Sequence, residues 1–309
     1  MKAKKATTAR EQPPPPLTFR DEDILQAVYT YRYITAKDIT SLFFSPSSIN
    51  YARERLAVLA GGADGKERAY LYRIAMPSRT GSRERVYTLG SAGREALINL
   101  GVPVEGYFRP YKAERLSHSH LAHQLTLTRF IVSACQWVHT NPEYTLTDMQ
   151  LCYEIEKSMA KLAGADQRTA ALVIPDGWLL FERVADKARS PVLVEIDRGS
   201  EYQERFKNHV RARIAFIHSG DYATVFGVPA VMIAYVTTGQ ISAYRETRVK
   251  TMAAWTREVL AELKMERWAG IFRFTSAVYE TLHVDAQTLL EKSVWYRPDS
   301  STPVPLFAS

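Results

Sequence analysis

Cysteine is scarce in this sequence, with only Cys135 and Cys152 among 309 residues. Two cysteines without zinc-ligand spacing provide no disulfide framework, so we expect both to be reduced and packed. Long apolar runs are also missing, because none approaches the roughly 18 residues that a membrane-spanning helix needs. The first twelve residues are polar and basic, with no apolar segment after them. We therefore expect no signal peptide, no membrane partner and a cytoplasmic location.

Several motifs of common enzymes are absent too, namely Gly-rich phosphate loops, zinc-finger spacings and nucleophile elbows. What the chain does have is a composition of 46% hydrophobic and 24% charged residues. This balance is typical of a globular protein rather than a disordered one. A chain of this length suits one large or two ordinary domains, and we favour two.

The positive charge is concentrated at one end of the chain. The formal net charge is +7, and residues 1–116 hold 19 Lys or Arg against 12 Asp or Glu, whereas residues 117–309 hold 21 of each. A basic N-terminal module beside a neutral remainder indicates a polyanionic partner, most simply nucleic acid. A basic surface that serves solubility alone is the alternative.

The N-terminal third has the pattern of a small helical domain behind a tether. Residues 1–17 are basic and proline-rich, so we expect them to be disordered. In the domain that follows, residues 18–100, Thr18 with Asp21 predicts the start of one helix and Thr35 with Asp38 the start of a second. A third helix begins near Pro46, which suits a first helical turn.

Two β-prone runs, residues 69–75 and 85–89, then predict a hairpin with a basic tip. Three helices and a hairpin in this order resemble a winged helix-turn-helix, whose third helix enters the major groove while the wing contacts the backbone. A winged helix that contacts only protein is the alternative. The candidate DNA-binding residues are Ser47, Ser48, Asn50, Arg53, Arg55, Arg79, Arg83 and Arg85.

We expect a linker at residues 101–116, a second domain at 117–275 and a loosely structured tail at 276–309. The second domain has a mixed α/β order. We expect helices near residues 118–139, 201–219 and 244–268, and strands near 146–155, 171–181, 191–197, 228–236 and 271–274. The helix at 201–219 should carry Arg205, Lys207, Arg211 and Arg213 on its polar sides.

Three carboxylates lie at the ends of predicted strands in this domain. Period-two geometry puts Glu195 and Asp197 on one face of their strand, and Asp176 lies between the two strand segments at 171–181. Converging carboxylates would suit a hard divalent cation. The alternative is that Glu195 and Asp197 are the wet face of a half-exposed strand.

The segment Pro175-Asp176, followed by Glu195, resembles the PD-(D/E)xK nuclease core. The resemblance implies a restriction-endonuclease-like mixed α/β fold and a Mg²⁺ or Mn²⁺ ion held by Asp176 and Glu195. The family pattern has Lys where this chain has Asp197, and an acidic residue that the helix at 118–139 lacks. Asp197 could be an extra ligand, and Arg198 or Lys207 could supply the missing positive charge.

Taken whole, residues 18–275 resemble the replication-relaxation family of plasmid and mobile-element proteins. The matching features are the winged-helix order, the helix entered through His118 to His123, and the segment Glu195-Ile196-Asp197-Arg198-Gly199-Ser200. This resemblance implies a DNA-binding protein of plasmid replication or mobilisation. It also allows a relaxase that nicks one strand at an origin.

Other chemistries compete for the same residues. His118-Ser119-His120 is similar to the His-hydrophobic-His metal motif of tyrosine relaxases, but Ser119 departs from it. His120 and His123, three apart on a helix, could hold a metal or form a polar helix entrance. Tyr202 could be a nucleophile, although tyrosine is abundant here at 17 residues.

Two hypotheses about function remain, beside a scaffold that does not bind DNA. In the first, the protein is a metal-dependent DNA nickase in which Asp176, Glu195 and Asp197 hold the ion and Arg198 or Lys207 stabilises the phosphate. In the second, it is a non-catalytic replication initiator or regulator. Residue 197 separates them, because Lys there would favour cleavage. The partners considered are double-stranded origin DNA and a second copy of the chain.

Overall fold

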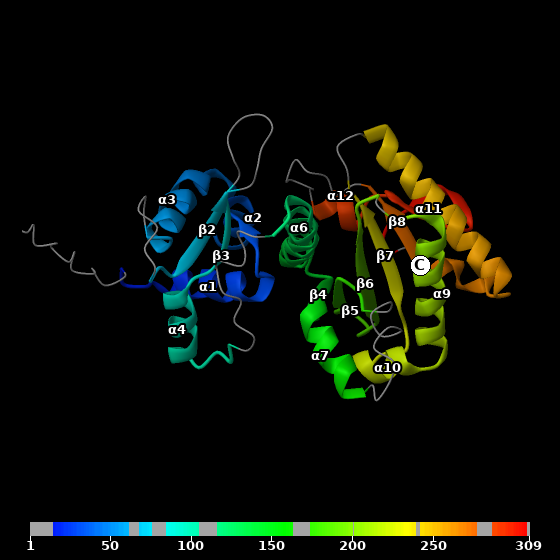
Figure 1. The fold of residues 1–309 in the computed structure, drawn as a ribbon, viewed down its shortest axis with the longest axis horizontal. Helices are drawn as coiled ribbons and strands as arrows, with labels where there is room; N and C mark the ends of the chain where they lie inside the picture. Colours follow the sequence, from blue (N-terminus) through cyan, green and yellow to red (C-terminus); the bar gives the residue numbers. More distant parts are fainter. Residues whose placement is uncertain are drawn as a thin grey trace, which may run out of the picture. The chain divides into compact units, whose positions relative to one another are not determined.

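The computed structural model describes residues 15–61, 68–75, 85–104, 116–162, 174–199, 201–238, 242–276 and 286–307. Contacts divide the chain into two compact units, residues 1–118 and 119–309. Figure 1 labels their helices and strands. No helix in the described ranges is both long enough and apolar enough to span a bilayer.

The first unit contains four α-helices in its described part, together with a small antiparallel sheet in the order β1-β3-β2. Its elements are α1 (Phe19–Tyr31), β1 (Ile34–Thr35), α2 (Ala36–Phe43), η1 (Pro46–Ser48), α3 (Ile49–Leu59), β2 (Leu71–Ala75), β3 (Arg85–Leu89) and α4 (Ser91–Asn99).

Both predicted capping boxes are confirmed. Thr18 and Asp21 exchange hydrogen bonds at the start of α1, and Thr35 and Asp38 do so at the start of α2. Each pair satisfies backbone N–H groups that the first turn leaves free. The two helices therefore begin at defined residues.

Two glycines allow close packing in the first unit, where α4 approaches β2. A Cβ atom at Gly90 would overlap the carbonyl oxygen of Ala69, and one at Gly93 would overlap that of Tyr70. Because only glycine lacks this atom, the sequence Gly90 to Gly93 lets the backbone of α4 lie directly against the sheet.

The second unit is built on a seven-stranded mixed sheet in the order β10-β9-β8-β7-β6-β5-β4. Strands β6, β7 and β8 are parallel, and the outer pairs are antiparallel. The strands are β4 (Tyr144–Leu151), β5 (Gly177–Arg183), β6 (Arg189–Asp197), β7 (Met232–Thr237), β8 (Phe272–Thr275), β9 (Trp295–Arg297) and β10 (Ser300–Val304).

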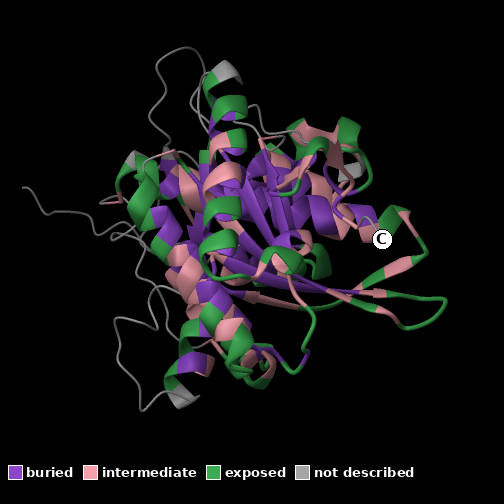
Figure 2. Ribbon diagram, turned by 90° about the vertical axis from the view of Figure 1, so that its right-hand side faces the viewer, coloured by how far each residue is buried: buried purple, intermediate pink, exposed green. Residues whose placement is uncertain are grey.

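Helices cover both faces of this sheet, as Figure 1 shows. They are α6 (His118–Thr140), α7 (Cys152–Leu162), α9 (Gln203–His218), α10 (Asp221–Phe226), α11 (Ser242–Glu262), η3 (Glu266–Ile271) and α12 (Ala286–Leu290). Figure 2 shows the inner strands as the buried centre and the outer helix faces as exposed. This mixed α/β architecture confirms the predicted class of the second domain.

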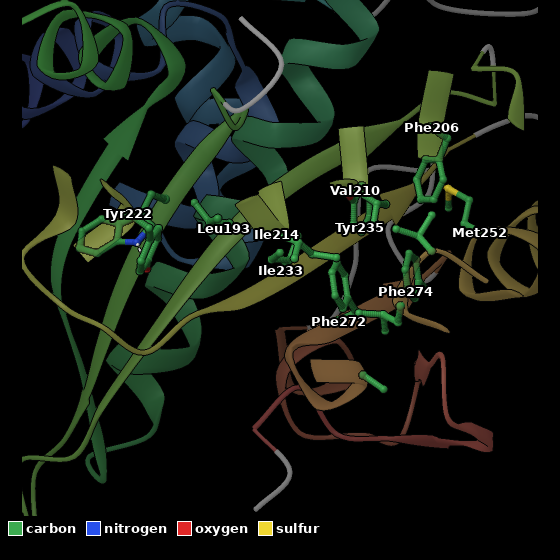
Figure 3. Packing of buried hydrophobic residues seen from close by; sticks show 14 of the residues in the cluster. Leu193, Phe206, Val210, Ile214, Tyr222, Ile233, Tyr235, Met252, Phe272 and Phe274 are labelled. Carbon is green, nitrogen blue, oxygen red and sulfur yellow. Dashed lines mark hydrogen bonds between the residues drawn. The ribbon is translucent and has the colours of Figure 1, made fainter. Parts of the chain in front are cut away.

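The main core fills the space between the sheet and the helices α7, α9, α10 and α11. Phe206, Val210 and Ile214 of α9 pack there against Leu193 of β6 and Tyr235 of β7 (Figure 3). Tyr235 stacks on Phe274 of β8 with ring centroids 5.1 Å apart. On the opposite face, aromatic contacts join α6 to the sheet.

The two edges of the sheet are irregular. The pairing of β4 with β5 shifts register between Leu146 and Asp148, and that of β10 with β9 shifts between Ser300 and Val304. Pro303 lies within β10, where its missing N–H group costs no hydrogen bond because the strand is at an edge.

The C-terminal segment differs from the expected tail. Residues 286–307 supply α12, β9 and β10, so the second unit extends well beyond residue 275. Trp295 is fully buried against Phe130 of α6, and Glu291 accepts a hydrogen bond from the Trp137 indole at 2.7 Å. Its prolines indicated an irregular chain, but the buried side chains of Leu289, Leu290, Trp295 and Leu306 pack it onto the unit.

Truncation of Trp295 tests whether the C-terminal segment is part of the folded unit. Trp295→Ala should lower the free energy of unfolding by about 3–5 kcal/mol, because it leaves a cavity at a fully buried site. Chemical denaturation measures the change. Val184→Ala, at a side chain that is 43% exposed, is the control and should change stability by less than about 0.5 kcal/mol. Equal stability of the Trp295 variant would contradict the assignment.

Candidate functional site

The carboxyl end of β6 brings together charged residues from three elements. Glu195 and Asp197 both face the helices that cover the main core, as their spacing predicted. They do not converge there, because Glu195 bonds Arg213 of α9 whereas Asp197 bonds Arg248 of α11. Each carboxylate is therefore paired separately with an arginine.

The Glu195–Arg213 pair lies inside the unit. Its side chains are only 15% and 3% exposed, and the guanidinium donates to one Glu195 oxygen. Burial raises the pKa of the Glu195 carboxyl to about 8, an increase that the charge of Arg213 partly opposes and that of nearby Asp176 supports. Within this pair, the Glu195 carboxyl therefore gains or loses its proton near neutral pH.

Asp176 lies next to this pair. The register of β5 with β6 pairs Gly177 with Val194, so one further step places Asp176 opposite Glu195. One Asp176 oxygen accepts from the backbone N–H of Ile196 at 2.8 Å, and the other is 2.9 Å from His123 Nε2. The structure thus brings Asp176 and Glu195 together, and it adds His123 from α6.

Asp197 belongs to a separate, more deeply buried pair. Arg248 donates two hydrogen bonds to its two oxygens, at 2.9 and 3.1 Å, and both side chains are under 10% exposed. The guanidinium also lies 5.2 Å from the centre of the Trp255 ring. Such a bidentate pair fixes α11 to the end of β6. The wet-face interpretation of this strand is wrong, because Asp197 is buried and bonded.

The two predicted phosphate-stabilising cations lie apart from each other. Arg198 is exposed and donates to the Ser119 hydroxyl at the start of α6, on the side of the site where His120 and His123 lie. Lys207 instead bonds Glu258 at 2.7 Å, with Glu262 at 3.9 Å, on α11. Lys207 is therefore part of a link between two helices rather than of the carboxylate cluster.

The helix entrance adds histidines to this region. Partial burial lowers the pKa of His120, and the charges of His123 and Arg198 lower it further. This effect favours the neutral imidazole.

His209 of α9 lies 3.4 Å from Glu201, and burial lowers its pKa as well. Tyr202, the alternative nucleophile, is 85% exposed.

Within the ranges that the structure describes, no group of three or more His, Cys, Asp or Glu residues is placed to hold a metal ion. The cause is visible in the geometry. Both oxygens of Asp176 are within hydrogen-bond distance of protein groups, Glu195 is bonded by a guanidinium, and Asp197 accepts two bonds from Arg248. The three carboxylates are engaged by protein partners.

Sequence reasoning missed three pairings of these carboxylates. They are Glu195 with Arg213, Asp197 with Arg248, and Asp176 with His123. Arg213 was expected on a polar side of its helix but is 3% exposed. A signal was available, because Arg213 lies seven residues after Phe206 and next to Ile214, on the apolar stripe. No local signal indicated that Arg248 pairs with Asp197.

The predicted DNA-binding residues of the first unit differ in exposure and in the contacts that they make. Ser47, Asn50, Arg53 and Arg85 are exposed, and Ser48 is half-buried beside Ser45. Arg79 and Arg83 lie outside the described residues. Arg55 forms hydrogen bonds of 2.9 and 2.5 Å with Asp21 of α1, which is almost fully buried. Arg55 therefore joins α3 to α1 rather than being free for DNA.

Comparison with known proteins identifies one family. The family model described as replication-relaxation matches residues 25–228, which is more than half of the chain. No curated protein and no solved structure gives a significant match.

The raised pKa of Glu195 predicts a pH dependence of stability. The folded chain binds a proton that the unfolded chain releases near pH 4.5, so the free energy of unfolding should fall as pH rises from about 5 to about 8. Glu195→Gln cannot titrate and should lack this contribution. Urea denaturation of both proteins at several pH values measures the difference. Parallel curves for the two proteins would contradict the prediction.

Proposed function

The chain belongs to the replication-relaxation family. We propose that it is a DNA-binding protein of plasmid or mobile-element replication that acts as an initiator or regulator. The family indicates a role in replication or relaxation. Sequence-specific contact with double-stranded origin DNA is the further step of the proposal. In it, the first unit reads the DNA and the second unit serves assembly.

The exposed surface of α3 is the observation that carries the proposal. Helix α3 follows α2 and precedes the β2–β3 hairpin, which is the order of a winged helix-turn-helix with α3 as recognition helix. Asn50, Tyr51 and Arg53 lie exposed on α3, with Tyr51 59% exposed. Amide and guanidinium groups are the ones that bond base edges in the major groove.

The excess charge supports the same assignment. Between residues 45 and 94, nine Lys or Arg face four Asp or Glu, so the positive charge is concentrated around α3 and the hairpin. Cationic side chains there would attract phosphates of either strand and give binding that weakens with salt. Arg85, exposed at the start of β3, is placed to contribute.

Removing Arg53 tests the recognition helix. Arg53→Ala should weaken binding to the cognate duplex by about tenfold or more, since a lost base or phosphate contact costs about 1–3 kcal/mol. Fluorescence anisotropy with labelled origin DNA measures the affinity. Arg189→Ala removes the same charge at an exposed site of the second unit, paired with Glu182, and should leave affinity nearly unchanged.

Arg55→Ala tests whether Arg55 of α3 stabilises the packing of α3 on α1 rather than contacting DNA. It should lower the melting temperature of the first unit, because Asp21 would be left buried without its cation. Binding by Arg53→Ala that equals wild-type binding would sink the assignment of α3 as recognition helix.

A metal-dependent nickase is the second candidate function. It is favoured by the adjacency of Asp176 and Glu195 across β5 and β6, which agrees with the resemblance of the second unit to a PD-(D/E)xK core. As placed, however, these side chains do not fit a Mg²⁺ or Mn²⁺ ion, because Arg213 and His123 bond them. We therefore derive no cleavage step from them.

Supercoiled origin plasmid distinguishes the two functions. We expect wild type, Asp176→Asn and Glu195→Gln all to shift the plasmid on a gel in the presence of Mn²⁺ without converting it to the open-circular form. The reason is that the carboxylates already have protein partners. Nicking by wild type that disappears in both variants would establish the nickase and overturn the non-catalytic proposal.

A further inference from the structure

A cavity of about 380 Å³ lies in the second unit, between α11 and the β9–β10 hairpin. Its walls include Lys250 and Arg257 of α11, with Tyr296, Arg297, Asp299 and Ser300 on the hairpin side. This volume is at the lower end of the range for small-ligand sites, about 300–1,000 Å³, and suits one nucleotide rather than a large molecule. None of these residues belongs to the carboxylate cluster.

The charge of the cavity is unbalanced. Lys250 and Arg257 are two turns apart on the same side of α11, and both are exposed. Within the described residues neither forms an ion pair, although Arg257 lies 3.5 Å from the carbonyl oxygen of Pro298. The single carboxylate of the lining, Asp299, is already engaged by Arg297 through hydrogen bonds of 2.9 and 2.6 Å.

A further cation lies behind the hairpin. Phe274 pairs with Tyr296 across β8 and β9, so one further step places Arg273 opposite Arg297. Like charges directly opposite in a sheet are unfavourable. Burial, together with the charge of Arg297, lowers the pKa of Arg273 to about 10. Arg273 does not line the cavity, but it adds to the positive potential there.

The chemistry of the walls indicates the ligand. Lys250 and Arg257, which form no ion pair among the described residues, suit the oxygens of a phosphate group, whereas the half-buried Tyr296 ring and Pro298 offer an apolar surface. The Ser300 hydroxyl already bonds the Thr302 backbone and is not counted among these groups. Phosphate contacts beside an aromatic side chain are typical of sites that hold a nucleotide of a single strand. A base-paired duplex could present its phosphates to the rim but could not insert a base.

We propose that this cavity binds one nucleotide of an unpaired DNA strand, with its phosphate at Lys250 and Arg257 and its base or sugar against Tyr296. The inference rests on the proposed function in that it takes DNA to be the partner. It goes further, because it gives the second unit a strand-holding site away from α3 and from the carboxylate cluster.

The test measures single-strand and duplex binding of the full chain by anisotropy, using a labelled oligothymidine and a labelled origin duplex. The variant Lys250→Ala with Arg257→Ala should bind the single strand about tenfold more weakly. Its slope of log affinity against log salt should decrease by about 1.4, as two lost phosphate contacts require. Its duplex affinity should change less than twofold.

The matched control is Arg189→Ala with Lys292→Ala, which removes the same charge at exposed positions outside the cavity. Single-strand binding by the cavity variant that equals wild-type binding, or an equal loss in the control, overturns the proposal. So does a variant that loses inorganic phosphate or thymidine monophosphate but keeps the strand, because the site would then serve small anions.

Tyr296→Ala separates a nucleotide site from a purely ionic one. It should weaken single-strand binding by about fivefold or more without changing the salt slope, since stacking contributes about 1–3 kcal/mol per base. An unchanged affinity would also count against the proposal. Failure of duplex binding in Arg53→Ala and in wild type alike would reject the proposed function, yet the single-strand measurement would still decide on the cavity.

Discussion

Two buried carboxyl groups at the end of β6 connect the central strand of the second unit to two of its helices. Removing a buried charge from water costs several kcal/mol unless a partner of opposite charge bonds it. Glu195 and Asp197 find such partners on different helices, Arg213 of α9 and Arg248 of α11. The positions of both helices relative to the central strand are therefore fixed by charge as well as by apolar packing. Loss of Arg248 would leave the Asp197 carboxylate buried without its partner, which typically costs about 3–5 kcal/mol.

The same pairs explain why the cluster differs from a ready cation site. Carboxylates bind a divalent ion with free oxygens, and here the oxygens of Asp176 and Asp197 are within hydrogen-bond distance of protein donors or of His123. What remains is a group of ionisable residues whose charge depends on its neighbours. Burial raises the pKa of Glu195 to about 8, so this carboxyl titrates near neutrality, whereas partial burial lowers the pKa of His120 and favours its neutral imidazole.

Local patterns predicted many of the elements but few of their partners, and the strand expected at 146–155 ends at Leu151, where helix α7 begins. The capping boxes at Thr18 and Thr35 and the strand ending at Asp197 follow from a few neighbouring residues, and all three are present. Long-range pairing has no such signature. The pairing of Asp197 with Arg248 spans fifty-one positions, and that of Arg55 with Asp21 spans thirty-four. Arg213 was placed on the polar face although its spacing from Phe206 puts it on the apolar stripe, and nothing in its own segment shows that Glu195 is its partner.

The irregular edges of the seven-stranded sheet bear on how copies of the chain can associate. A regular edge strand exposes unpaired N–H and C=O groups that can recruit a strand from another molecule. Strand β10 interrupts that row with Pro303 and a shift in register, and β4 does so with its bulge at Leu146. Neither edge offers a straight template, so the sheet is protected from growing by strand addition. A second copy of the chain would therefore have to contact this unit through side-chain surfaces rather than by extending its sheet.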